Sequence, residues 1–248
     1  MSGNRGGAGS PPLFDRQLLR MGSIAFLAGL VIFVASTILH PSSEDPTNHP
    51  VVFEEYTKDN LWIASHIGQF AGGIVIFAGG FTALCRLLVH SESQSTTPAL
   101  AWIGFVIALI TASSLAVLQA VDGIALKRAV DSWTAAPAEE RATAFRIAEG
   151  IRWIEIGFNS IFRILQGTVG IIFGVAIIKS TLISKWIGVV GALAGVATII
   201  LGVNVAYVGF ATVHSIVDTV STVTYLGWLV ILGIFMWRKS VSRVVTKK

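Results

Sequence analysis

Five polar residues recur at helical spacing in and just before the apolar segment Trp153–Ile178. The intervals between them are three, four, four and three residues, and the five are Arg152, Glu155, Asn159, Arg163 and Gln166. Such intervals place side chains on one face of an α-helix. Guanidinium, carboxylate and amide groups on one face can bind a charged ligand, hold a cofactor or relay protons.

The depth of this polar face in a membrane decides where it must point. From Arg152 to Gln166 a helix rises about 21 Å, which is about two thirds of the hydrocarbon thickness of a bilayer. An arginine exposed to lipid would cost about 3 kcal/mol or more. We therefore expect the face to point into the protein, where Arg163 pairs with one of three acids, Asp122, Glu155 or Asp218.

The composition is that of an integral membrane protein. Of 248 residues, 53% are hydrophobic and only 13% are charged, against about 25% charged residues in soluble domains. Six apolar stretches are each long enough to span a bilayer: Leu18–Ile38, Leu61–Val89, Leu100–Val121, Trp153–Ile178, Trp186–Val208 and Ala211–Trp237. The predicted fold class is all-α, a polytopic membrane protein with six transmembrane helices in one bundle. Residues 1–17 are predicted to be a disordered cytoplasmic tail, residues 18–240 the transmembrane domain and residues 241–248 a basic cytoplasmic tail.

The basic residues predict the orientation. The side that carries both termini has eleven Lys and Arg residues and two acids, whereas the remainder has seven basic and twelve acidic residues. The positive-inside rule then predicts a multi-pass protein of the cell (inner) membrane with both termini in the cytoplasm. Because the basic residues flank the membrane segments without interleaved aromatic residues, nucleic acid is excluded as a partner. The lipid bilayer is the expected partner.

The connections and small residues predict how the bundle is arranged. Residues 123–150 are rich in Ala, Arg and Glu, with Pro137 near a helix start and Glu139 and Glu140 in its first turn, which predicts an outer helical hairpin. Residues 42–60 are predicted to be a loop. Two GxxxG steps, Gly170–Gly174 and Gly191–Gly195, favour close contact between the fourth and fifth helices.

Other polar residues fall in the same outer half of the predicted helices. A single outward-facing cavity is expected to contain His66, Gln69, Gln119, Asp122, Glu155, Asn159, Arg163, Gln166 and Asn204. The candidate metal ligands are His66, His214 and Asp218. With neutral histidines, three acids and Arg163 leave about two negative charges, which favours a cation. His40 and His49 lie beside prolines and are predicted to be exposed turn residues.

Three mechanisms could use such a cavity. A divalent metal or haem b could be held by His66 and His214, with Arg163 or Arg152 at the propionates and Asp218 orienting His214. A proton- or cation-coupled transporter, as a homo-oligomer, could relay charge through the acids and Arg163. A metal-dependent hydrolase could hold zinc between the two histidines and an aspartate, although no HExxH or GxSxG motif is present. Because the inner halves of the helices are apolar, we favour ligand or cofactor binding.

Overall fold

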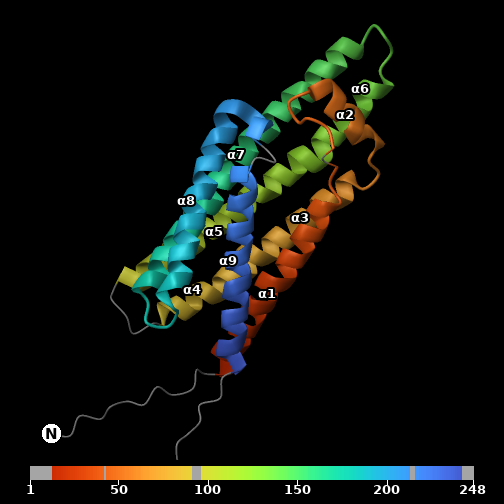
Figure 1. Ribbon diagram of the computed structural model, residues 1–248. Coiled ribbons are helices and arrows are strands. Elements are labelled where there is room, and N and C mark those ends of the chain that lie inside the picture. Colours follow the sequence, from red (N-terminus) through yellow and green to blue (C-terminus); the bar gives the residue numbers. More distant parts are fainter. Residues whose placement is uncertain (1–12, 42, 91–95, 213–215, 242–248) are drawn as a thin grey trace, which may run out of the picture.

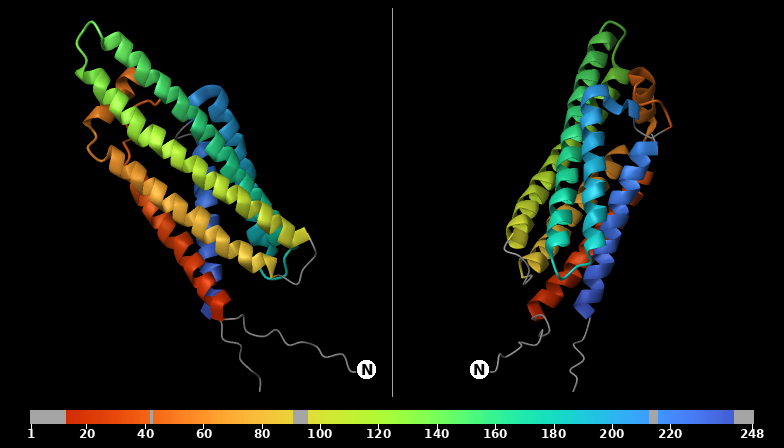
Figure 2. Two further views of the ribbon diagram at one scale, coloured as in Figure 1. Left: turned by 180° about the vertical axis from the view of Figure 1, so that it is seen from behind. Right: turned by 60° about the vertical axis from the view of Figure 1, so that its left-hand side comes forward.

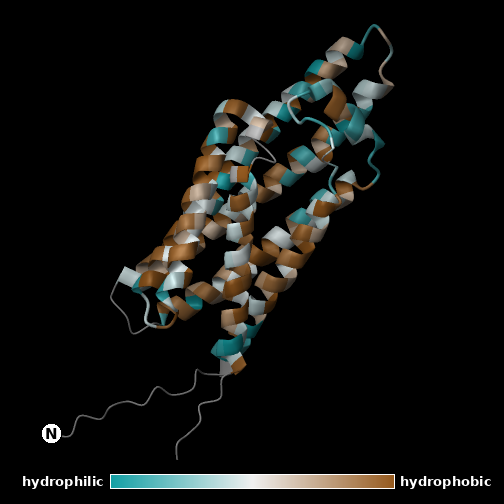
Figure 3. Cartoon of the chain, viewed as in Figure 1, coloured by the Kyte–Doolittle hydropathy of each residue, from teal (hydrophilic) through white to brown (hydrophobic). Residues whose placement is uncertain are grey.

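The computed structural model describes residues 13–41, 43–90, 96–212 and 216–241 (Figure 1). Within these ranges the chain is helical and has no strand. Six spans are long and apolar enough to cross a membrane, which confirms the predicted class of a polytopic helical bundle. Apolar residues line most of the length of the helices, while hydrophilic residues gather near their ends and in the connections (Figure 3).

Three of the six spans are built on single helices of 24 to 26 residues, two contain a π-helical segment, and one is a single helix of 39 residues. The simple ones are α1 (Leu13–Ile38), α8 (Lys185–Val208) and α9 (Ile216–Val241). The second span runs through α3 (Trp62–Ile74), η1 (Val75–Gly80) and α4 (Phe81–Val89), and the third through α5 (Thr96–Ala120), η2 (Val121–Leu126) and α6 (Lys127–Ala135). Both η1 and η2 are π-helical. Segments of this type are rare inside α-helices and frequently occur at functional sites.

The fourth span, α7 (Arg141–Lys179), is much longer than a bilayer requires. Its 39 residues extend over about 58 Å. Together with α6 it forms a hairpin that projects past the ends of α8 and α9 (Figures 1 and 2), and this agrees with the predicted helical hairpin. Pro137 and the two following glutamates lie in the turn between the helices, so the acids precede the first turn of α7 and are not part of it.

A helix occupies most of the connection that was predicted to be a loop. The helix α2 (His49–Lys58) packs against the hairpin through a separate apolar cluster made by Val52, Phe53, Tyr56, Trp62, Leu126, Val130 and Ala148. The ammonium of Lys127 donates to the carbonyls of Tyr56 and Thr57 at 2.9 and 3.1 Å. A cation at a helix C-terminus satisfies carbonyls that have no partner within the helix. We call this end of the bundle, with α2 and the α6–α7 hairpin, the hairpin end.

Aromatic side chains fill the interior of the bundle between the hairpin end and the opposite end. Phe81 is buried at the centre, and its ring lies 5.1 Å from that of Phe26, 4.9 Å from that of Phe173 and 6.1 Å from that of Trp228. In the same half of the molecule, Ser23 of α1 donates a hydrogen bond of 2.7 Å to the carbonyl of Gly233 in α9. This half is therefore densely packed.

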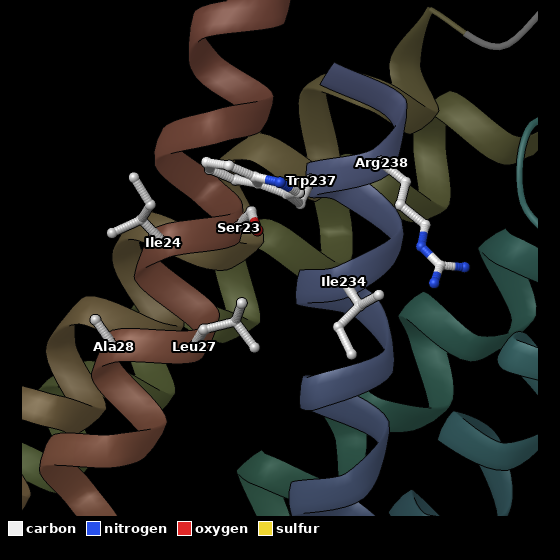
Figure 4. Close-up of a pocket in the computed structure, with 7 residues that line it drawn as sticks. All are labelled: Ser23, Ile24, Leu27, Ala28, Ile234, Trp237 and Arg238. Atoms are coloured by element: carbon white, nitrogen blue, oxygen red, sulfur yellow. The ribbon is translucent and has the colours of Figure 1, made fainter. Parts of the chain in front are cut away.

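A shallow apolar pocket lies beside the contact between α1 and α9. Its volume is about 380 Å³, and Ile24, Leu27 and Ile234 form much of its wall (Figure 4). The guanidinium of Arg238 points away from the pocket in this view. The apolar walls suit a lipid chain better than a polar ligand.

The helices α7 and α8 pack backbone to backbone. A Cβ atom on Gly174 would lie 2.6 Å from the carbonyl oxygen of Gly188, and one on Gly170 would lie 3.0 Å from that of Gly191. Side chains at these positions would push the helices apart. The expected contact between the two GxxxG steps is therefore present, and Gly188 extends it by one position.

Alanine at Gly174 should destabilise the bundle, because its methyl group has no space. We expect Gly174→Ala to cost about 1–3 kcal/mol, measured as a lower thermal unfolding temperature in detergent. The matched control is Gly157→Ala on the same helix, where nothing lies within 4 Å of the added Cβ. Equal unfolding temperatures for the two variants would contradict close packing of α7 on α8.

Candidate functional site

A cavity of about 430 Å³ lies in the hairpin-end half of the bundle. We call it the polar cavity. Its wall includes residues of α1, α2, α3, α5, η2, α7, α8, the 3-10 helix η3 (Gly209–Thr212) and α9, so all six spans contribute to it. Eight residues expected at the site from the sequence line it, namely Gln69, Gln119, Asp122, Glu155, Asn159, Arg163, Gln166 and Asp218.

The remaining sequence-predicted residues are placed differently. His66 is almost fully buried, at 1% exposure, and lies behind Asp122 instead of at the cavity wall. Asn204 is half-buried on α8 and is not among the lining residues. His214 lies outside the described residues, so its expected pairing with His66 stays a prediction.

Arg163 is held by two neighbours. Its Nη1 atom lies 3.0 Å from Oδ1 of Asp218 on α9, and its Nε donates to Oδ1 of Asn159 at 3.0 Å. The pair joins α7 to α9. The expected pairing of this arginine with an intramembrane acid is therefore present.

A second ion pair on α7 is more deeply buried. Nη1 of Arg152 lies 2.9 and 2.7 Å from the two carboxylate oxygens of Glu155, and both side chains are only 3% exposed. The guanidinium also lies 4.6 Å from the ring centre of Phe210 and 5.5 Å from that of Tyr56, at distances where a cation is attracted to an aromatic face. The three-residue spacing of Arg152 and Glu155 was visible in the sequence, but their burial depends on η3 and α2.

His40, His66 and Asp122 form a compact cluster at the edge of the polar cavity. Each offers a ligand atom, and these atoms lie within 4.8 Å of one another. The prediction that His40 is an exposed turn residue is wrong. Its ring lies 4.7 Å from that of Trp62 and 5.0 Å from that of His66, because the chain after α1 folds back over the start of α3. Burial lowers the pKa of His40, although the carboxylate of Asp122 opposes this shift, so the imidazole is neutral near pH 7.

The backbone around Asp122 is also fixed by a neighbouring helix. Asp122 lies in η2, where the π-helical turn alters the regular hydrogen bonding, and its carbonyl accepts a hydrogen bond of 3.1 Å from the indole of Trp62. The ring centre of the same indole lies 4.6 Å from that of His66, with the two rings tilted by 35°. Trp62 therefore contacts two of the three members of the cluster, His66 and Asp122.

The prediction for His49 is also wrong. Its side chain is buried, stacks on Phe53 at 5.6 Å and lies 3.3 Å from Oε1 of Glu149 on α7. It is not among the residues that line the polar cavity. This histidine holds α2 against the hairpin.

Acidic groups predominate in the polar cavity. Two arginines, Arg152 and Arg163, face five acids, which are Glu44, Glu55, Asp122, Glu155 and Asp218. Among the side chains that the structure describes, Oε2 of Glu55, Oδ1 of Asp122 and Oε1 of Gln119 are buried acceptors without a hydrogen-bond partner. A buried carboxylate oxygen without a partner is costly, so the cavity favours a ligand that donates hydrogen bonds and carries positive charge.

The geometry does not favour haem at His66. Oδ2 of Asp122 lies 3.0 Å from Nε2 of the imidazole, in the space where a haem iron would be. The rings of Trp62 and His40 lie against the same imidazole. A porphyrin at this nitrogen would have to displace Asp122.

Three arginines on α7 should differ in their importance for stability according to burial. Their side chains are 3% exposed at Arg152, 21% at Arg163 and 77% at Arg146, and each is paired with an acid. We expect Arg152→Leu to lower the free energy of unfolding by about 3–5 kcal/mol, because it leaves the buried carboxylate of Glu155 without its partner. Arg146→Leu should change stability by about 1 kcal/mol or less, with Arg163→Leu in between. Thermal unfolding in detergent measures the order, and an Arg152→Leu variant as stable as Arg146→Leu would contradict a buried ion pair.

Comparison with known proteins identifies a family. No match was found among curated proteins or among solved structures. A family model described as "Domain of unknown function (DUF4386)" matches residues 21–236, from α1 to near the end of α9. The matched region contains every residue of the polar cavity. The chain therefore belongs to the DUF4386 family.

Proposed function

We propose that the polar cavity binds a small organic cation that enters from the extracytoplasmic side of the membrane. The observation that carries this proposal is the excess of acids over arginines in a cavity where buried carboxylate oxygens of Glu55 and Asp122 have no hydrogen-bond partner among the described residues. An ammonium group supplies three hydrogen-bond donors and a positive charge. Such a group matches both the excess of acids and the carboxylate oxygens that have no hydrogen-bond partner in the described part of the chain.

The size and the apolar part of the wall indicate an organic ligand. The volume of about 430 Å³ lies within the range of small-molecule pockets and far exceeds the space of a single ion. Aromatic side chains contribute to the wall, among them Tyr56, Phe162 and Tyr225. Aromatic faces attract organic cations and pack against their hydrocarbon parts.

The apolar packing between the polar cavity and the opposite end of the bundle favours binding over transport. The buried rings around Phe81 fill the bundle between the polar cavity and the opposite end. A conducted ion would need polar groups along its whole path. The half of the bundle around Phe81 is instead apolar and close-packed, which supports a site that opens at the hairpin end alone.

A matched pair of probes tests the charge preference. Phenethylamine should raise the unfolding temperature of the purified protein, because a ligand that binds the folded state stabilises it, whereas phenylpropanoate, which has a similar shape and negative charge, should not. Glu55→Gln should weaken the effect of the amine by at least about tenfold in apparent affinity, since a carboxylate–ammonium contact is worth about 1.5–3 kcal/mol.

The control for this experiment is Glu54→Gln, the same change at the neighbouring exposed position of α2, which should leave the amine's effect unaltered. The cation proposal fails if the carboxylate probe stabilises the protein as much as the amine, or if neither probe has an effect at millimolar concentration.

The proposed side of entry requires the hairpin to lie outside the cell and both termini inside. Cysteine introduced at Ser132 in α6 should react with an impermeant maleimide in intact cells. Cysteine at Ser184, which is exposed at the opposite end before α8, should react only after lysis. The native Cys85 is buried and provides a low background. The reverse labelling pattern would place the cavity mouth in the cytoplasm.

A further inference from the structure

We propose that His40, His66 and Asp122 bind one divalent transition-metal ion of the zinc class at the edge of the polar cavity. Their ligand atoms lie within 4.8 Å of one another. A zinc ion with bonds of about 2 Å holds its ligand atoms about 3–4 Å apart. Small side-chain movements would therefore close the cluster on an ion.

Hydrogen bonds to the backbone prepare both imidazoles for a metal. Nδ1 of His40 lies 2.6 Å from the carbonyl oxygen of Pro41, and Nδ1 of His66 lies 2.7 Å from that of Trp62. A carbonyl oxygen only accepts, so each Nδ1 carries the proton and donates it. In the neutral imidazole, each Nε2 then has a lone pair that can bind a metal. This arrangement, with the second ring nitrogen bonded to a carbonyl, is typical of histidines that bind metals.

A second observation indicates a missing ligand between these side chains. Nε2 of His66 lies 3.0 Å from Oδ2 of Asp122, and in a neutral imidazole with its proton on Nδ1 both atoms are acceptors. Both Nε2 of His66 and Oδ1 of Asp122 are buried and lack a hydrogen-bond partner among the described residues. A cation placed between the lone pairs would satisfy both groups.

The chemistry of the ligands selects the class of metal. Two imidazoles and one carboxylate suit zinc and related transition metals, whereas calcium and magnesium prefer sites made of oxygen ligands. Three protein ligands leave a fourth position open on a tetrahedral ion. His40 and Asp122 also line the polar cavity, so we infer that the open position faces the cavity.

Metal content and affinity test the inference directly. The full-length protein, stripped with a chelator in detergent and dialysed against Zn²⁺, should retain one ion per chain by elemental analysis. Co²⁺ should give the visible absorption of a tetrahedral site. His40→Gln and Asp122→Asn should each weaken Zn²⁺ binding by at least about tenfold. Loss of a residue that only orients a metal ligand already weakens metal binding by about 10- to 100-fold.

The matched control is His49→Gln, which removes another buried histidine at the same end and should leave Zn²⁺ affinity unchanged. His40 is half-buried, so its variant should fold even if a His66 variant does not. Zinc content well below one ion per chain, or equal affinity in His40→Gln and His49→Gln, overturns the inference. Both proposals use Asp122, but the metal site does not need the organic ligand: a chain that binds zinc without binding phenethylamine would refute only the ligand proposal.

Discussion

The inability of lipid to solvate charge is the constraint on which the rest of the structure depends. Two arginines on α7 lie within a membrane span and must find partners inside the protein. Arg163 meets Asp218 from α9, and Arg152 meets Glu155 under α2 and η3. The first pair joins two spans and the second lies within one helix, and both are at the wall of the polar cavity to which all six spans contribute.

The polar cavity lies towards one end of the bundle, whereas close backbone contacts and aromatic rings fill much of the rest of its interior. Glycines bring the backbones of α7 and α8 into contact, and the rings around Phe81 fill the centre. From the hydrogen bond between Ser23 and Gly233, α1 and α9 diverge towards the hairpin end (Figures 1 and 2). The diverging half of α1 contains Thr37 and that of α9 contains Asp218, and both residues line the cavity. Dense packing at one end thus leaves space at the other.

Periodicity predicted the spans and much of the cavity, because membrane depth and helical spacing are local properties of the sequence. The pairing of Arg163 followed from its depth alone. In contrast, α2 was missed because a ten-residue amphipathic segment is stabilised mainly by the hairpin against which it packs. His40 was misplaced for a similar reason: its burial requires a fold of the chain over Trp62. Asn204 lies at a suitable depth but on a face of α8 that does not reach the cavity.

We propose that charges at membrane depth meet in one site for a cation. An experimental structure in a lipid nanodisc with phenethylamine tests it most directly. We expect density for the amine in the polar cavity, with its nitrogen within about 3 Å of a carboxylate oxygen of Glu55 or Asp122. An amine bound elsewhere on the bundle, or a cavity in which those carboxylates contact only protein groups, would contradict the proposed cation site.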